Sequence, residues 1–382
     1  MFTEINPRLD SILQLTKMTK KQTLLIIYNN MNLGGIQIKI IDIINQIHKN
    51  HKNTNLILCL RKKEGIFLKK ISLKTKIISP NINRSSWQLI LFPFWITYQI
   101  IKYKPRIILT FMDYAAISTL IAKKICFWTK TKIIINEEIT TSIHTKTQKF
   151  PFLRFFLIRL LYPATHRILV PTITQKKDLI KLTNIKPSKI IITPNWLPQI
   201  VLQKKTKKRT KTTDILFMGR LEYQKNPTRL IKIIKLVKKE KPDIKTKIVG
   251  SGSLRKKIKK LISKNNLQKN IKLYSSTKIP EIFYNQSKIL LLPSRYEGFP
   301  FSLLEALFAN CLPIVSNIQE FKSFFTKYKK NLIFKTNKQA GKQIIHLLKH
   351  KKTRKQITKY YHNKVKKEQK PNIKKTIKLI VN

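Results

Sequence analysis

The feature that most constrains the fold is an alternation of short apolar runs with longer amphipathic stretches, and the whole series occurs twice. The runs are rich in β-branched residues and are continuous, with no polar residue at every second position. Continuous runs separated by helices are typical of parallel strands that are covered on both faces of a sheet. We therefore predict an α/β chain with two doubly wound, Rossmann-like domains.

A basic, polar stretch without apolar periodicity separates the two series and predicts an interdomain linker at residues 201–213. The N-terminal domain is then expected to span residues 1–200 and the C-terminal domain residues 214–382. Residues 1–20 are interpreted as an extension or a misplaced start, because Met18 stands shortly before the first expected strand. Strands are expected at 23–28, 56–60, 76–79, 106–110, 132–136, 167–171 and 189–193, and then at 214–218, 245–249, 271–274, 288–292, 312–315 and 332–334.

The charge balance is extreme. Lys and Arg number 79 against 17 Asp and Glu, so the formal net charge is +62 at pH 7. Such a field attracts polyanions, including nucleic acid, anionic lipid and phosphorylated substrates. Compositional drift is the competing explanation, because Lys, Ile, Asn and Thr are all abundant. A hydrophobic fraction of 42% argues against disorder across the whole chain.

The cysteines and the longest apolar run bear on the compartment. Cys59, Cys126 and Cys311 are widely spaced, which argues against a disulfide framework or a zinc site and indicates a reduced cytosol. The first 20 residues lack the apolar core of a signal peptide. Residues 87–101 form the longest apolar run, which is shorter than the roughly 20 residues of a spanning helix and is interrupted by Pro93. We expect a cytoplasmic protein.

Glycine is scarce, with eight residues in the chain, so its placement is informative. Six glycines follow expected strands at loop positions, where glycine permits positive φ and close approach of the backbone to a ligand. Loops that lead into helix N-termini in this way suit phosphate binding. None forms a complete GxGxxG or Walker A loop, and glycines also end strands in α/β proteins without any ligand. The six are Gly34, Gly35, Gly219, Gly250, Gly252 and Gly298.

Glutamates cluster in one window of the second series. The expected strand 288–292 leads into a loop that contains Glu297, and a helix from about Ser302 then carries Glu305 in its first turn. Both carboxylates are placed to face a ligand at the end of the strand, although acids near helix N-termini are also common as solvated residues. The six aspartates are isolated and form no DxD pair. We therefore predict no metal.

This window resembles a known family. Ser294–Pro300, followed by Glu305-Ala306, resembles the E-x7-E motif of retaining glycosyltransferase family 4, a group 1 glycosyltransferase family with the GT-B fold of two Rossmann-like lobes. Other segments resemble elements of the family in the expected order, and together they cover the chain from about residue 24 to 335. They are Gly34-Gly35, Pro194-Asn195, Phe217–Leu221 with Lys225-Asn226, and Ile248–Gly252.

The resemblance implies transfer of a hexose-type sugar from a nucleotide sugar, expected to be a UDP-sugar, with retention of configuration. The acceptor would be a glycan or a lipid-linked sugar in cell-surface polysaccharide or glycolipid synthesis, and no cofactor is implied. Arg220 and Lys225 would hold the donor diphosphate and neutralise the charge of the leaving group. Glu305 would accept hydrogen bonds from the ribose. Glu297 would lie near the donor sugar, with the backbone of the Gly298-Phe299-Pro300 loop close to its hydroxyls.

The N-terminal half departs from the family pattern. The glycine loop at Gly34-Gly35 would approach the diphosphate and the acceptor. Many members carry a histidine near the acceptor, but the comparable strand end here has none, so Asp113 and Glu137 are our acceptor-side candidates. His144 is a loop histidine nearby. Asn310 replaces the glycine that usually follows the second glutamate, and Asn tolerates left-handed geometry.

Two basic, aromatic segments, residues 87–104 and 149–162, suit either a membrane interface or a core-facing helix. An anionic membrane surface is thus an expected partner, with the protein peripheral to the inner face. One alternative function is non-specific binding of nucleic acid through charge alone. Another is an inactive transferase relic, against which the joint presence of Arg220, Lys225, Glu297 and Glu305 argues.

Overall fold

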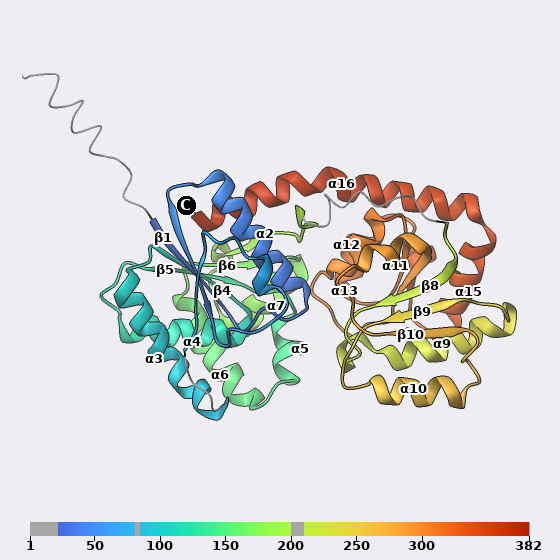
Figure 1. Ribbon diagram of the computed structural model, residues 1–382, viewed down its shortest axis with the longest axis horizontal. Coiled ribbons are helices and arrows are strands. Elements are labelled where there is room, and N and C mark those ends of the chain that lie inside the picture. The colour runs from blue at the N-terminus through green and yellow to red at the C-terminus, as the bar shows by residue number, and fades with distance from the viewer. Residues whose placement is uncertain (1–21, 81–84, 200–209, 382) are drawn as a thin grey trace, which may run out of the picture. The chain divides into compact units, whose positions relative to one another are not determined.

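The computed structural model describes residues 22–80, 85–199 and 210–381 (Figure 1). The expected extension at residues 1–20 and most of the expected linker at 201–213 lie outside these residues. Contacts divide the chain into two compact units. The first contains residues up to Asn136, Leu160–Ile168 and the chain end from Leu379, and the second contains Glu137–Arg159 and Leu169–Lys378. The domain limits at residues 200 and 214 remain predictions.

The first series forms a sheet of seven strands within the described residues, in the order β3-β2-β1-β4-β5-β6-β7. Its strands are β1 (Gln22–Tyr28), β2 (Thr54–Leu60), β3 (Lys76–Ile78), β4 (Ile107–Phe111), β5 (Lys132–Asn136), β6 (Arg167–Val170) and β7 (Ile190–Ile192). The helices of this series are α2 (Gly35–Asn50), α3 (Ser85–Tyr103), α4 (Met112–Ile125), α5 (Thr141–Lys146), α6 (Pro151–Leu161) and α7 (Ile173–Thr183).

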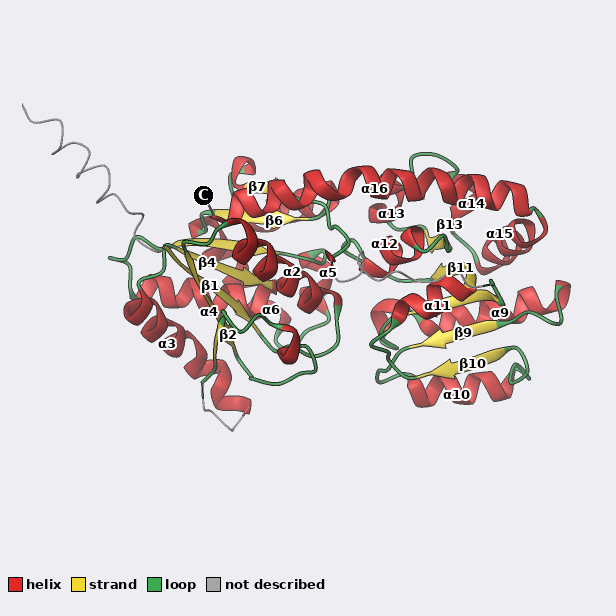
Figure 2. Cartoon of the chain, turned by 45° about the horizontal axis from the view of Figure 1, so that its top comes forward, coloured by secondary structure: helices red, strands yellow, loops and turns green. Residues whose placement is uncertain are grey.

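The second series forms a sheet of six described strands in the order β10-β9-β8-β11-β12-β13. Helices flank the strands (Figure 2). The strands are β8 (Thr213–Met218), β9 (Thr246–Val249), β10 (Ile271–Tyr274), β11 (Ser287–Leu292), β12 (Leu312–Ser316) and β13 (Ile333–Phe334). The helices are α9 (Pro227–Glu240), α10 (Arg255–Lys264), α11 (Pro280–Gln286), α12 (Phe301–Phe308), α13 (Gln319–Phe324), α14 (Lys329–Leu332), α15 (Asn337–Lys349) and α16 (Lys351–Val381).

Every strand expected from the sequence is present, with limits that differ by two residues or fewer, and the α/β fold of two Rossmann-like sheets is confirmed. The physical reason is burial on both faces. In β1, for example, Leu25, Ile26 and Ile27 are all fully buried, which a half-exposed strand would not allow. Parallel pairing of β1 with both β2 and β4 sets Leu24 opposite Leu56 on one side and Ile107 on the other.

In both sheets the strand order places a topological switch point where ligands of such folds bind. The first sheet switches between β1 and β4, so the loops after these strands carry Gly34 and lead to Asp113. The second sheet switches between β8 and β11, and the loops after these strands carry Arg220 and Glu297. The strand order therefore brings together candidate residues that are far apart in the sequence.

Helix α3 contains Pro93, which interrupts the apolar run in the sequence without ending the helix. The helix runs continuously from Ser85 to Tyr103. Pro93 removes one backbone donor, but its own carbonyl still accepts a hydrogen bond from the Thr97 hydroxyl at 3.0 Å. Among the described residues, no helix is long and apolar enough to cross a membrane. All three cysteines are buried free thiols, as the spacing indicated.

Close backbone approach at Gly250 gives a test of the second sheet. A Cβ atom there would lie 1.9 Å from the carbonyl oxygen of Gly219, so Gly250→Ala must shift backbone. We expect it to lower the free energy of unfolding by about 2 kcal/mol or more in urea titrations. Gly341→Ala in α15 is the matched control, because the nearest atom to a Cβ there is Leu236 Cβ of α9, at an ordinary contact distance of 3.7 Å. It should raise stability by about 0.5–1 kcal/mol. Equal effects of the two substitutions would contradict this geometry.

Candidate functional site

The centre of the candidate site is the carboxylate of Glu297, which follows β11 and is 3% exposed. Its Oε1 forms a salt bridge with Lys225 Nζ at 2.6 Å and accepts a hydrogen bond from Ser294 Oγ at 2.6 Å. Its Oε2 accepts a hydrogen bond from Gln224 Nε2 at 3.3 Å. Three donors from two loops therefore fix the carboxylate.

Gln224 extends this network to Arg220. Its Oε1 accepts a hydrogen bond from Arg220 Nη2 at 2.9 Å, while its backbone carbonyl accepts one from the Arg295 amide at 2.9 Å. Arg220 itself is exposed. Gln224 is one acceptor of its guanidinium, and an exposed guanidinium with five N–H donors can also bind an anion.

The turn after β9 is tied to the same loop. Glu222 accepts hydrogen bonds from the Ser253 amide at 2.7 Å and from Ser253 Oγ at 2.6 Å. The Leu254 amide donates to the carbonyl of Leu221 at 2.9 Å. A Cβ atom on Gly252 would lie 2.6 Å from that same carbonyl oxygen, so glycine is needed for the close approach. The predicted residues Gly219, Gly250 and Gly252 thus form one compact backbone surface at the strand ends.

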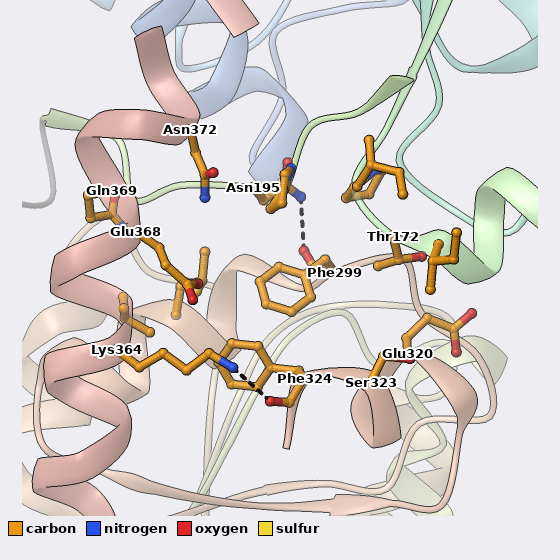
Figure 3. Close-up of a pocket in the computed structure, with 16 residues that line it drawn as sticks. Thr172, Asn195, Phe299, Glu320, Ser323, Phe324, Lys364, Glu368, Gln369 and Asn372 are labelled. Carbon is orange, nitrogen blue, oxygen red and sulfur yellow. Dashed lines mark hydrogen bonds between the residues drawn. The ribbon is translucent and has the colours of Figure 1, made fainter. Parts of the chain in front are cut away.

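The Gly298–Pro300 loop is held by backbone contacts within the second unit. Gly298 pairs with Ile139 in an isolated antiparallel bridge, and a Cβ atom on Gly298 would lie 1.5 Å from the carbonyl oxygen of Glu138. Asn195 Nδ2 donates to the Phe299 carbonyl at 3.0 Å (Figure 3). It also donates to Glu138 Oε2 at 2.9 Å. The asparagine of the expected Pro-Asn element therefore fixes this loop.

A cavity of about 280 Å³ lies beside Phe299 (Figure 3). Its lining includes the side chains of Phe299 and Phe324, residues of α16 and residues that follow β6 and β7. The polar groups buried in its wall already have partners. Glu320 accepts a hydrogen bond from Thr140 Oγ1 at 2.8 Å, and Gln369 Oε1 accepts one from the Leu197 amide at 2.6 Å. We therefore interpret this cavity as a packing feature that supports the Phe299 loop.

Glu305 lies on α12, as expected, and is half-buried. Burial, followed by the negative charge of Glu305, raises the pKa of Tyr284 on α11 well above its ordinary value. Helix α12 begins without a side-chain cap, and Ser302 Oγ is buried at its first turn without a hydrogen-bond partner. The helix N-terminus is thus open to an anionic or hydroxyl-bearing ligand.

The glycine loop of the first unit leads into α2. Gly34 is the N-cap of α2 with φ −179°, which is extended backbone that any residue adopts, so the positive φ that glycine permits is not used at this position. Gly35 is the first residue of α2. The helix has no side-chain cap at this end, so its first N–H groups are open. Ligand binding by Gly34 and Gly35 remains a prediction.

Asp113 is the second residue of α4, directly after a strained junction with β4. Met112, directly before it, has φ 67°, and this left-handed geometry costs a non-glycine residue roughly 1–2 kcal/mol. Asp113 is buried and its Oδ1 accepts a hydrogen bond from the Tyr114 amide at 2.8 Å. Such strain is concentrated at functional sites, which favours Asp113 as a candidate. Glu137 is 1% exposed and its amide donates to the Leu169 carbonyl. Acceptor-side roles for both remain predictions.

The structure also identifies residues that the sequence analysis missed. Gln224, Ser294 and Glu222 each bind a predicted site residue or fix a predicted loop. Ser294 precedes Glu297 by three residues within the quoted motif, whereas Gln224 lies between the two quoted segments that carry Arg220 and Lys225. In the first unit, the buried Lys39 Nζ donates to Asn136 Oδ1 at 3.2 Å. No sequence signal distinguished Lys39 among 79 basic residues.

Within the described ranges, no group of three or more His, Cys, Asp or Glu side chains is placed to hold a metal ion. The charge at this site is balanced by side chains, Lys225 against Glu297. That the site needs no metal remains a prediction.

The Lys225–Glu297 pair can be tested by a double-mutant cycle. Lys225→Met leaves the Glu297 carboxylate buried without its cation, and we expect it to lower the free energy of unfolding by about 3 kcal/mol. Lys225→Met/Glu297→Gln should recover at least half of that loss, because no buried charge is then left uncompensated. Urea unfolding of the four proteins at pH 7 measures the coupling. Additive effects of the two single substitutions would show that the pair is not coupled.

Glu320 gives the fold a pH dependence. Burial raises the pKa of its carboxyl, and the charges of Glu297 and Asp178 add to the rise. The folded state therefore binds this proton more tightly than the unfolded state, so stability falls as pH rises from about 4.5 through the raised pKa. Glu320→Gln should flatten this decline in urea titrations between pH 5 and pH 8. The exposed Glu240→Gln is the control and should keep the wild-type slope. If Glu320→Gln left the fall of stability with pH unchanged, the pH dependence would belong to another titratable group.

Comparison with known proteins agrees with this geometry. Residues 199–364 match the family described as glycosyl transferases group 1. The chain is 31% identical over 266 residues to an uncharacterized glycosyltransferase of Methanocaldococcus jannaschii, a match that covers 64% of each chain. It is 30% identical over 194 residues to N-acetylgalactosamine-N,N'-diacetylbacillosaminyl-diphospho-undecaprenol 4-alpha-N-acetylgalactosaminyltransferase of Campylobacter jejuni, covering 50% of this chain and 52% of that one. The matches thus span about half to somewhat under two thirds of these relatives' lengths.

The fold is shared with solved structures. A structure of the Anabaena protein HepE in complex with UDP and glucose superposes with a TM-score of 0.75 over 93% of this chain and 98% of that chain, at 12% identity. At that identity the likeness establishes the architecture, which is GT-B. Residues 199–364 are thus similar to the group 1 glycosyltransferases, and the chain shares the GT-B architecture.

Proposed function

We propose that the protein transfers a hexose-type sugar from a nucleotide sugar to a glycan or lipid-linked acceptor, with retention of configuration, in the synthesis of cell-surface polysaccharide or glycolipid. The observation that carries this proposal is the network of Arg220, Gln224, Glu297 and Lys225 at the switch point of the second sheet. It combines an open guanidinium, a lysine and a fixed carboxylate on adjacent loops.

The donor diphosphate would bind at the strand ends of the second unit. Arg220 is exposed and would offer a bidentate contact, and Lys225 would supply a second cation. The uncapped N-terminus of α12 adds backbone N–H groups. These groups would stabilise the charge that develops as the nucleoside diphosphate leaves. Glu305, one turn into the same helix, would accept the ribose hydroxyls. UDP is the expected nucleotide by family likeness.

Glu297 would act beside the donor sugar. Ser294 and Gln224 hold its carboxylate independently of Lys225, so Lys225 can also contact the diphosphate without releasing the glutamate. A negative charge fixed in this way would favour the positive charge that a sugar ring acquires when its bond to the leaving group lengthens. The backbone of Gly298 and Phe299, held by Glu138 and Asn195, would line the place of the sugar hydroxyls.

The acceptor is proposed from the relatives and from the charge of this chain. The Campylobacter relative is named for a diphospho-undecaprenol-linked acceptor. A net charge of +62 would attract such a diphosphate and an anionic membrane surface. Asp113 and Glu137 are the proposed acceptor-side groups, and the protein would work at the cytoplasmic face.

Two alternatives are less well supported. Non-specific binding of nucleic acid would need basic residues but no organised carboxylate, so the buried Glu297 and its three donors argue against it as the sole function. An inactive relic would tolerate loss of the buried Lys225–Glu297 pair, yet both members and their hydrogen-bond partners are present.

Nucleotide binding tests the donor site. In thermal-shift titrations with UDP, GDP and ADP, one nucleotide should raise the melting temperature above the others. Arg220→Ala and Glu305→Ala should each weaken its binding by about tenfold or more, which is about 1.4 kcal/mol. Lys257→Ala on α10 removes one exposed charge elsewhere and should bind as the wild type does. Equal stabilisation by all nucleotides and by DNA, in the wild type and both variants, would assign the binding to charge alone and reject the donor site.

A further inference from the structure

Helix α6 exposes an apolar stripe that the described residues leave uncovered. Phe152, Phe156 and Leu160 are spaced four residues apart, so they share one face of the helix. Their exposed fractions are 89%, 61% and 52%. Phe150 and Leu153 extend the surface, with exposed fractions of 72% and 56%. We call these five side chains the α6 stripe.

The alternative interpretation of this segment, a helix whose apolar residues face the core, does not describe the five exposed side chains of the α6 stripe. Ile158 and Leu161 are buried, and they anchor the helix to the protein. The α6 stripe points elsewhere. Large apolar side chains that gather on one surface in this way mark a binding site, because isolated exposed residues are common but a contiguous set of three phenylalanines and two leucines is not.

The charge around the stripe selects the kind of partner. Lys149 and Arg159 are exposed at its two ends, and the chain has no Asp or Glu from residue 139 to 177. A partner must therefore accept apolar side chains and cations on the same surface. The interface of an anionic membrane does both, because acyl chains take up the aromatic rings while lipid phosphates pair with the cations.

We propose that α6 is a membrane-docking helix, which lies in the interface of an anionic bilayer with the α6 stripe inserted and with Lys149 and Arg159 at the level of the headgroups. The helix has 11 residues and does not span the bilayer. The proposal does not depend on the proposed transfer reaction, since docking is measured without donor or acceptor.

A second surface of this kind lies on α3, in the first unit. Ile90, Phe94, Tyr98 and Ile101 follow one face of the helix, with exposed fractions of 62%, 58%, 55% and 47%. Beside the end of α4, Phe127 is 77% exposed. The α3 surface provides a matched comparison for α6, because it has similar apolar residues on another helix.

Vesicle sedimentation tests the proposal. The wild-type protein is mixed either with vesicles of phosphatidylcholine alone or with vesicles that also contain about 30% phosphatidylglycerol. Each mixture is measured at about 0.1 M and about 0.5 M NaCl. Salt screens the general attraction of a +62 protein for anions, so binding that persists at high salt reports insertion. We expect anionic vesicles to retain the wild type at both salt concentrations. Phe152→Ser/Phe156→Ser should bind at least tenfold more weakly at high salt.

Matched variants separate insertion from charge and from unfolding. Leu73→Ser removes an apolar side chain that is fully exposed outside both helices and should bind as the wild type does. Lys149→Gln/Arg159→Gln should reduce the preference for anionic vesicles, whereas Lys256→Gln/Lys259→Gln on α10 removes the same charge elsewhere and should not. Unchanged far-ultraviolet circular dichroism and melting temperature show that the variants are folded.

Insertion is measured directly with Phe156→Trp, whose added fluorescence should be quenched by lipids brominated on their acyl chains. Unchanged binding of Phe152→Ser/Phe156→Ser at high salt would overturn the proposal, as would complete loss of wild-type binding there. Loss in Phe94→Ser/Tyr98→Ser with no loss in the α6 variant would assign docking to α3 and also overturn it. A dimer in solution that the α6 variant abolishes, without any change in vesicle binding, would identify a second copy as the occupant and contradict a membrane role.

Discussion

The contact between Lys225 and Glu297 is the interaction on which the candidate site depends. It joins the loop after β8 to the loop after β11, and these strands are neighbours at the switch point of their sheet. A carboxylate that is 3% exposed needs such compensation, because burial of an unpaired charge costs several kcal/mol. Gln224 and Ser294 share the carboxylate, and through Gln224 the exposed Arg220 belongs to the same network. The site is therefore organised before any ligand arrives.

Local patterns predicted the fold almost completely. Continuous β-branched runs identified each strand, since burial on both faces leaves a signature within five or six residues. The scarce glycines also predicted the positions of loops. Only eight of the 382 residues are glycine, and six of them follow expected strands. Asn310 was expected to replace glycine in left-handed geometry, and its φ of 54° confirms this. The E-x7-E spacing correctly placed Glu297 in a loop and Glu305 on a helix.

What the sequence did not reveal depended on contacts between distant segments. Met112 has no intrinsic preference for left-handed geometry, so its φ of 67° follows from the way β4 and α4 are packed. Gly34 turned out to be extended, because glycine permits unusual geometry without requiring it. The exposure of α6 could not be predicted from the sequence either, since an apolar, basic helix suits both a protein core and a membrane interface. Gln224 has a role only because its side chain reaches both Arg220 and Glu297.

The bridge between Gly298 and Ile139 has a mechanical consequence. No side chain fits between Gly298 and the Glu138 carbonyl, so the two backbones are in direct contact with nothing compressible between them. Asn195 fastens the same two segments by holding both Glu138 and Phe299. The loop that presents Glu297 cannot move without pulling the segment that begins at Glu137. A displacement of the loop that carries Glu297 is therefore transmitted to Glu137, and a displacement at Glu137 is transmitted to that loop.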